Sequence, residues 1–352
     1  MKFTLLIEGT ARRGVSVHQL YNEAVELIDA AEELGFDAFG CSEQHFWPQV
    51  GDIPPIATIP TPELLYAYAA RNTKRLTIRT AVSVLPLRPP LLVAEQVASL
   101  DILSGGRMQF GTGRGNSTTA SDAYGIPTDE TYERWEESIK LILEAWTTEG
   151  EFSWEGKYYS VPPLHFQPKP LQKPHPKLFY AALSPQSHQL AGDLGMSLLT
   201  GTAGVTLEKL SRRIEMYRQA FRNRSNTIGY TPEESVSLTV LANCTEDEAT
   251  AKAQSEQAFI DYFTSATSVY STTVHRLDSH VDFSKIREQY TYDRMRETVM
   301  VIAGTPDTWT QQLGRLVDVG VDEVTVNFGA MEHQDTLSAM ALLSSEVMPK
   351  FR

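Results

Sequence analysis

The sequence predicts a (β/α)8 barrel, in which eight parallel strands alternate with eight helices. Amphipathic helices that end in glycine are followed by short apolar strands, as at Leu20–Gly35 and then Phe36–Cys41. This order recurs along the chain, and alternation of helix and strand requires parallel strands joined by right-handed crossovers. About eight such units can be counted, which favours a closed barrel. An open doubly wound sheet remains the alternative.

Each expected element follows from its local pattern. Apolar residues three and four positions apart give the helices a face that packs on the sheet, and Gly35, Gly195 and Gly320 can end three of them in the left-handed conformation. The helices are expected at Leu20–Leu34, Pro62–Asn72, Leu91–Leu103, Tyr132–Trp146, Leu190–Gly195, Leu207–Phe221, Leu313–Val317 and Thr336–Val347. Short apolar runs between them predict strands at Phe3–Ile7, Phe36–Cys41, Leu76–Leu85, Met108–Gly111, Leu178–Ala182, Met196–Leu199, Val236–Leu241 and Val321–Val326.

Two stretches do not fit the alternation. Phe152–Tyr159 predicts a hairpin with Gly156 in its turn, and the proline-rich Val161–Pro176 is expected to run extended over the surface. The second stretch, about 253–298, lies between the seventh and eighth units and is too long for a simple connection. It is interpreted as an insertion over the barrel mouth, with an extra packing pair of helices as an equal alternative. The whole chain, 1–352, is expected to form a single domain.

Charge and cysteine content restrict the partners and the compartment. The 352 residues include 31 Lys and Arg and 44 Asp and Glu, so the net charge is −13. An acidic chain is a poor binder of nucleic acid or of an anionic membrane, although a local basic spot for one phosphate is still allowed. The two cysteines, Cys41 and Cys244, are too few for a disulfide framework. Without an apolar run of about 20 residues, the chain is expected to be cytoplasmic.

Candidate catalytic residues follow the second strand. In a barrel of this kind, active sites form at the carboxyl ends of the strands. Glu43, Gln44 and His45 lie at such an end, with the aromatic side chains of Phe46 and Trp47 beside them. His45 is a candidate proton shuttle. A lone histidine more often packs under a loop and bonds a carbonyl, but the position at a strand end favours the functional interpretation.

Candidate ligand-binding residues follow the next strands. Gly111–Ser117 alternates glycines around Arg114, and backbone donors with an arginine suit a phosphate. The segment is neither a P-loop nor a dinucleotide fingerprint. Ser184 or Ser187 can cap the helix after the fifth strand, and the same helix end can face an anion. The small residues after the third strand, beginning at Ala81, could admit a flat ligand, although an ordinary inner barrel layer explains them better.

No metal site is predicted. His165 and His175 are ten positions apart in the proline-rich loop, and the sequence contains no HxxxH or CxxC spacing. A serine nucleophile elbow of the GxSxG type is absent as well.

Taken together, these motifs resemble those of the bacterial luciferase-like flavin monooxygenases. The resemblance extends from Met1 to Arg352, apart from the insertion. The segments that carry it are Glu43–Phe46, Leu85–Pro86, Ala94–Gln96, Leu100–Arg107, Phe110–Gly115, Gly304–Pro306 and Glu346–Phe351.

The resemblance implies a barrel that binds FMN, in the reduced form FMNH2, at the carboxyl ends of its strands. Ala81 and Val82 match a cis peptide bond behind the flavin ring, and Glu95 matches a carboxylate near the flavin. The phosphate-side residues that it implies are Gly113, Arg114, Gly115, Asn116, Leu183, Ser184 and Ser187.

The implied chemistry is the reaction of FMNH2 with O2 to a flavin hydroperoxide, which transfers one oxygen atom to a small, largely apolar substrate. His45 matches the second histidine of the family motif, and Glu43 precedes it. The first histidine is replaced by Gln44, which cannot titrate. Either His45 takes over proton transfer, or the chemistry differs from that of luciferase. A separate NAD(P)H-dependent flavin reductase and a homodimer are also implied.

Two other functions remain open. Relatives of this fold transfer hydride with a deazaflavin, and Glu43–Phe46 argues for the flavin branch instead. A non-catalytic flavin-binding protein is the third possibility, and Gln44 is the residue that favours it.

Overall fold

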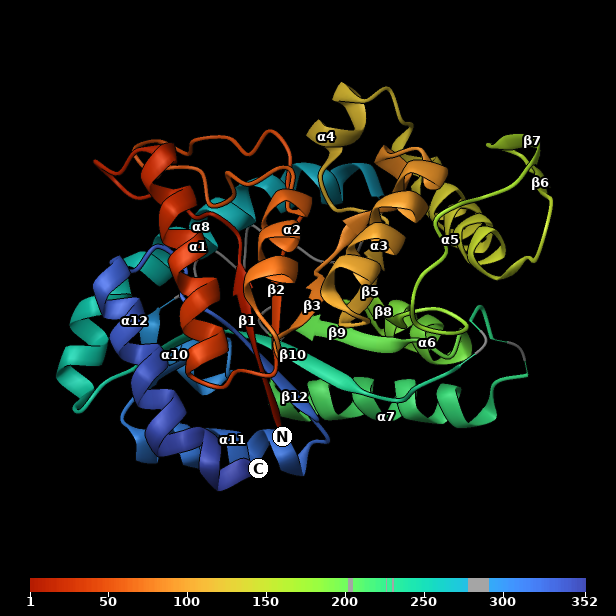
Figure 1. Cartoon of the computed structure of the whole chain (residues 1–352). Helices are drawn as coiled ribbons and strands as arrows, with labels where there is room; N and C mark the ends of the chain where they lie inside the picture. The colour runs from red at the N-terminus through yellow and green to blue at the C-terminus, as the bar shows by residue number, and fades with distance from the viewer. Residues whose placement is uncertain (202–204, 226, 230, 278–290) are drawn as a thin grey trace.

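Eight parallel strands close into a barrel in the computed structural model of the chain (Figure 1). The structure describes residues 1–352 except 202–204, 226, 230 and 278–290, and the side chains of 268 and 270–277. Lys2 pairs with Glu323 where the last barrel strand meets the first, so the wall has no open edge. In their order around the barrel, the strands are β1 (Lys2–Ile7), β2 (Ala38–Cys41), β3 (Thr77–Thr80), β5 (Met108–Gly113), β8 (Lys177–Ala181), β9 (Ser197–Gly201), β10 (Val236–Cys244) and β12 (Glu323–Asn327). The predicted closed barrel is confirmed, and the open sheet is excluded.

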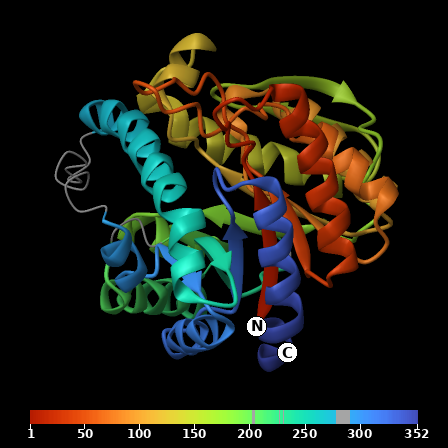
Figure 2. The same cartoon turned by 90° about the vertical axis from the view of Figure 1, so that its left-hand side faces the viewer.

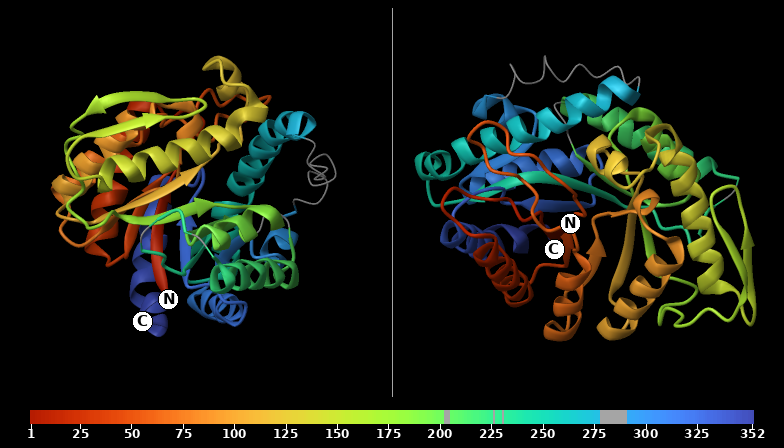
Figure 3. Two further views of the ribbon diagram at one scale, coloured as in Figure 1. Left: turned by 90° about the vertical axis from the view of Figure 1, so that its right-hand side faces the viewer. Right: turned by 90° about the horizontal axis from the view of Figure 1, so that it is seen from above.

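A ring of helices covers the outside of the barrel (Figure 3). Apolar side chains on the outer face of the strands pack on these helices: Phe39 contacts Tyr66, and Phe110 contacts Trp146. The helices that follow the eight strands are α1 (Val17–Glu33), α2 (Glu63–Asn72), α3 (Pro90–Ser104), α5 (Thr131–Thr147), α6 (Pro185–Asp193), α7 (Leu207–Asn223), α11 (Pro306–Asp318) and α12 (His333–Leu342). Shorter elements are α4 (Thr118–Ala123), η1 (Leu85–Leu87), η2 (Thr128–Glu130), η3 (Leu343–Val347) and η4 (Met348–Phe351).

The third expected strand and the expected hairpin are both found in the structure, with different bounds. The predicted strand Leu76–Leu85 is divided into β3 and β4 (Ser83–Val84), with a cis peptide bond between Ala81 and Val82. A hairpin with Gly156 in its turn is confirmed, but it is longer than expected: β6 (Phe152–Glu155) pairs antiparallel with β7 (Ser160–Leu164), and β7 lies beyond Tyr159 in the proline-rich stretch.

Between β10 and α11 the chain forms α8 (Glu248–Leu277), α10 (Tyr292–Glu297) and β11 (Val301–Gly304). The predicted insertion therefore begins about five residues earlier than expected, and its residues 278–290 lie outside the described part. β11 extends the sheet from the end of β10, outside the barrel circuit. α8 contacts the barrel mouth, because Tyr262 bonds Glu8 of the β1 end and Ser265 bonds Trp47 of the β2 loop (Figure 2).

A buried ion pair fills the barrel interior near the amino ends of the strands. Both terminal guanidinium nitrogens of Arg79 on β3 contact the carboxylate of Glu323 on β12. Thr4 and Ser237 each donate a hydrogen bond to the same carboxylate at 2.8 Å. The Arg79 guanidinium also lies 4.0 Å from the centre of the Phe179 ring. Burial alone would raise the pKa of Glu323, but Arg79 and the hydroxyl donors outweigh it and hold the pKa at about 2.

The two chain ends meet beneath the barrel (Figure 1). The amino group of Met1 donates to the carbonyl of Phe351 at 2.5 Å. None of the helices in the described residues combines the length and apolar character that a membrane span requires.

Candidate active site at the carboxyl ends of the strands

The β2 end carries a carboxylate and an imidazole in direct contact. Oε1 of Glu43 lies 3.0 Å from Nε2 of His45, and Oε2 accepts the backbone N–H of Val84 at 3.1 Å. Arg88 lies 3.3 Å from the same oxygen and also contacts Glu63. Because the Glu43 side chain is almost fully buried and has three donors, its position is fixed, and it orients the His45 ring.

An aromatic neighbour that the sequence did not indicate completes the surroundings of His45. The Tyr124 hydroxyl, at the end of α4, lies 3.4 Å from Nδ1 of His45, and the two rings meet edge to face. Phe46 packs against both rings with a left-handed backbone. His45 is thus placed between a carboxylate and a phenol, an arrangement suited to proton transfer. Gln44 is half-buried and makes no hydrogen bond within the described part of the chain.

Small residues bring the ends of β3 and β5 close together beside the cis peptide. A Cβ on Gly113 would lie 3.1 Å from Val82, and a Cβ on Gly115 would lie 2.7 Å from Val84. Gly115 also has a φ of 81°, a backbone region that favours glycine. Ala81 and Val82 are half-exposed at this wall, which therefore has few protruding side chains.

Arg114 follows directly at the end of β5. It is exposed, and no carboxylate of the described residues lies within ion-pair distance of it. Its charge acts on Tyr180 of β8: burial raises the pKa of Tyr180 to about 12, although Arg114 opposes the rise. Asn116 is half-buried two residues farther on, and Ser117 caps α4.

The amino end of α6 lies at the same edge as Arg114. Thr112 pairs with Tyr180, so the turns after β5 and β8 leave the barrel side by side. Ser184 and Ser187 form a reciprocal capping box, in which each hydroxyl oxygen accepts the other residue's backbone N–H at 3.0–3.1 Å. The capping role is therefore confirmed. For an anion this turn keeps the backbone N–H of Gln186, because Pro185 has none and the N–H groups of Ser184, Ser187 and His188 are already bonded within the turn.

A second cation supports this turn. Nη1 of Arg213, from α7, donates to the carbonyl of Leu183 at 2.7 Å. Burial lowers the pKa of the adjacent His188 to about 4, so this ring is neutral and links Ser184 to Thr200 by hydrogen bonds. Sequence reasoning missed Arg213, because α7 carries several arginines and only the tertiary fold selects one of them.

Glu95 lies on α3 and not at the end of a strand. It is exposed, and no hydrogen bond or ion pair of the described residues involves it. Its neighbour Gln96 contacts Arg88 instead. The two side chains differ because adjacent residues of an α-helix point about 100° apart, so Gln96 faces Arg88 and Glu95 does not.

Sequence reasoning also missed Glu8, at the end of β1. Its Oε1 accepts from Ser42 at 3.2 Å, and its Oε2 accepts from Tyr262 at 2.7 Å and from Asn327 at 2.5 Å. Burial raises the pKa of Glu8 and outweighs these three hydrogen bonds, which lower it. The available signal was the same one used for His45, namely a polar residue at a strand end.

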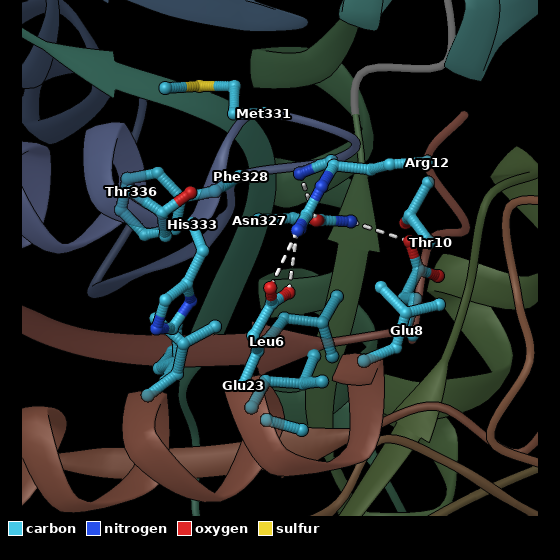
Figure 4. A pocket seen from close by; sticks show the side chains of 17 residues that line it. Leu6, Glu8, Thr10, Arg12, Glu23, Asn327, Phe328, Met331, His333 and Thr336 are labelled. Atoms are coloured by element: carbon cyan, nitrogen blue, oxygen red, sulfur yellow. Dashed lines mark hydrogen bonds and ion pairs between the residues drawn. The ribbon is translucent and has the colours of Figure 1, made fainter. Parts of the chain in front are cut away.

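Glu8 faces a crevice between the β1 and β12 ends and the helices α1 and α12 (Figure 4). Arg12 crosses this crevice and bonds both oxygens of Glu23, at 2.8 and 2.7 Å. The remaining wall is largely apolar, with Leu6, Leu20, Ala24, Leu27, Phe328 and Met331.

An apolar cluster lies over the mouth, where α8 meets the loop after β2. The Trp47 ring donates to Ser265 at 2.9 Å. The buried residues of the cluster are Trp47, Ile56, Ala57, Ala266 and Val269. In the described residues, no group of three or more His, Cys, Asp or Glu is placed to hold a metal ion.

The sequence profile of luciferase-like monooxygenases matches residues 1–323, most of the chain. The chain belongs to this family. The oxygenase component of a flavin-dependent trigonelline monooxygenase from Acinetobacter baylyi is 30% identical over 182 residues, which are 51% of this chain and 48% of that protein. The chain thus spans about half the length of the first curated relatives that it matches.

Two further relatives of this luciferase-like chain differ in cofactor. The F420-dependent glucose-6-phosphate dehydrogenase of Amycolatopsis mediterranei is 26% identical over 336 residues, 94% of each chain. The oxygenating constituent of 3,6-diketocamphane monooxygenase from Pseudomonas putida, solved with FMN, has a TM-score of 0.80 at 22% identity. It covers 99% of this chain and 98% of that chain. This structural likeness supports the barrel fold.

Proposed function

We propose that this chain is the oxygenase of a two-component system, which uses reduced FMN and O2 to insert one oxygen atom into a small, largely apolar molecule. A separate NAD(P)H-dependent reductase supplies the reduced flavin. The observation that carries the proposal is the exposed Arg114 beside the amino end of α6, which has no carboxylate partner among the described residues. An arginine beside a helix amino end favours an anionic group, and the phosphate of FMN is such a group.

The residues of the mouth fit FMN in three respects. Arg114, Asn116, Leu183 and the Ser184–Ser187 turn would hold the phosphate, with Arg213 supporting the turn. Ala81, Val82 and Gly113 form a wall of small residues with few protruding side chains, against which a flat ring could lie. When bound, reduced FMN would supply the electrons that activate O2.

The chain's own groups would then control water and protons. His45, held by Glu43 and next to Tyr124, is the proton-transfer group of the β2 side. The packed apolar cluster at α8 would exclude water from the mouth. Gln44 has no titratable group, so it can only donate or accept hydrogen bonds with a bound ligand.

A hydride-transfer enzyme that uses F420 is the second candidate, and the relative from Amycolatopsis mediterranei favours it. Both candidates predict a bound isoalloxazine-like ring, but they differ in the cofactor that binds.

Anaerobic mixing with reduced FMN, followed by oxygen, tests the proposal. We expect FMN to bind and its absorbance to return to the oxidised form more slowly than that of free FMN, because the site shields the ring from water. A parallel titration uses F420 without oxygen. Binding of F420 alone would establish the second candidate, and FMN oxidation at the free-solution rate would contradict the oxygenase.

We further propose that the protein is a cytoplasmic homodimer, formed through α2 and α3. Leu92, Ile102 and Leu103 of α3 are 44%, 46% and 61% exposed, and Leu64 of α2, which packs beside α3, is 66% exposed. Exposed apolar side chains gathered on neighbouring helices indicate an interface. The buried free thiols of Cys41 and Cys244 are compatible with a reducing compartment.

Replacing Leu103 by arginine is expected to convert the dimer to a monomer, since it places a charge in the apolar contact. Sedimentation velocity measures the change, with Val317→Arg on α11 as a control at another exposed apolar position. A wild-type monomer, or a variant that remains dimeric, would refute the interface.

A further inference from the structure

We infer that Glu8 is a proton-exchanging residue of the barrel mouth, which gives a proton to an oxygen atom of the ligand bound there and regains it from solvent. The O–H bond of the carboxyl breaks, its electron pair stays on Glu8, and a new O–H bond forms on the ligand. The inference rests on the proposed function, because that reaction is the one that generates an oxygen in need of a proton.

The partners of Glu8 distinguish it from the other carboxylates nearby. Glu43 contacts Arg88, and Glu23 contacts Arg12, so each has a cation that favours its ionised form. Glu8 has hydrogen-bond donors from Ser42, Tyr262 and Asn327, and none of them is charged. No cation of the described residues lies within ion-pair distance of it.

The charged groups around Glu8 are engaged elsewhere. On its own loop Arg12 bonds Glu23 of α1, and His333 of α12 bonds Glu26 at 2.7 Å. The thiol of Cys41 on β2 is neutral, because burial raises its pKa well above the usual value. The phenol of Tyr262 on α8 donates to Glu8, and β12 presents the neutral amide of Asn327. The three hydrogen bonds lower the pKa of Glu8, but no cation of the described residues adds to them, and burial outweighs them and raises the pKa.

Glu8 also has a path for its proton on either side. It lines the crevice between α1 and α12 (Figure 4), and it is only half-buried, so part of the residue reaches solvent. On the other side it contacts Ser42, the residue directly before Glu43, and Tyr262 of the helix that covers the mouth. Tyr262 and Asn327 are positioning residues, since they hold the carboxyl and its orientation.

The ligand-free protein provides the first test. In a carbon-13 NMR titration of labelled glutamate side chains, we expect one carboxyl with a pKa above 4.5 to disappear in Glu8→Gln. In Tyr262→Phe the same carboxyl should titrate at a still higher pH, because a hydrogen bond that lowers its pKa has been removed. The control Glu26→Gln, an exposed carboxylate of α1, should leave this titration unchanged. If Glu8→Gln removes only carboxyls that titrate at or below 4.5, the inference is wrong.

The second test uses reduced FMN and O2 as the probe. We expect Glu8→Gln to bind FMN as the wild type does, but to return oxidised flavin roughly 10²-fold more slowly. In the wild type this rate should change at the pH at which the Glu8 carboxyl titrates, and in Glu8→Gln that change should be missing. Wild-type rates and pH profile in Glu8→Gln would overturn the inference while leaving the oxygenase intact. A wild type that does not bind FMN would instead overturn the proposed function, and the NMR titration would still decide the state of Glu8.

Discussion

Replacing Glu323 by glutamine is expected to lower the free energy of unfolding by about 3–5 kcal/mol. The change leaves Arg79, a fully buried cation, without its counter-charge inside the barrel. Urea unfolding followed by circular dichroism measures the loss. Glu208→Gln is the matched control, because Glu208 also pairs with an arginine but on the surface, where an ion pair contributes about 0–1 kcal/mol.

The same pair predicts how stability depends on pH. The pKa of Glu323 is about 2 in the folded chain and near 4.5 in the unfolded chain, so the pair's contribution is complete above pH 4.5. This contribution is lost as the pH falls toward 2, because Glu323 binds a proton at a higher pH in the unfolded chain than in the folded chain. At neutral pH, the lowered pKa of Glu323 contributes roughly 3 kcal/mol to the free energy of unfolding. Equal acid sensitivity of the wild type and Glu323→Gln would contradict this account.

Removing the Arg114 side chain is expected to weaken the binding of FMN about 10- to 100-fold, since a charge-assisted bond to phosphate contributes about 1.5–3 kcal/mol. Riboflavin, which has the ring but no phosphate, should bind Arg114→Ala as it binds the wild type. Equilibrium dialysis of both ligands measures the difference.

Two further variants sharpen the phosphate assignment. Arg213→Ala should weaken FMN binding by a smaller factor, because Arg213 acts through the Leu183 carbonyl of the turn. Arg212→Ala removes an exposed cation one position earlier on α7 and should have no effect. Equal losses for FMN and riboflavin in Arg114→Ala would show that the arginine stabilises the mouth and does not bind phosphate.

Local sequence patterns were sufficient to predict the barrel and to find candidate residues on one side of its mouth. The spacing of apolar residues that marks a helix or a strand is a local property of the sequence. Each of the eight expected strands overlaps a strand of the barrel. His45, Arg114 and Ser184 could be found because parallel strands of a barrel share one carboxyl edge. Glu95 could not be placed in this way, because its side chain direction depends on the phase of α3 about its axis.

The tertiary structure alone decided which distant side chains meet. Glu8 and Tyr262 are 254 positions apart, and Arg79 and Glu323 are 244 apart. No local pattern encodes such contacts, since they depend on barrel closure and on the path of α8. The sequence by itself therefore determined the fold class, the family and a phosphate-suited turn. Only the folded chain determined which carboxyl has a cation and which has neutral donors, because burial and charge pairing arise from packing between elements.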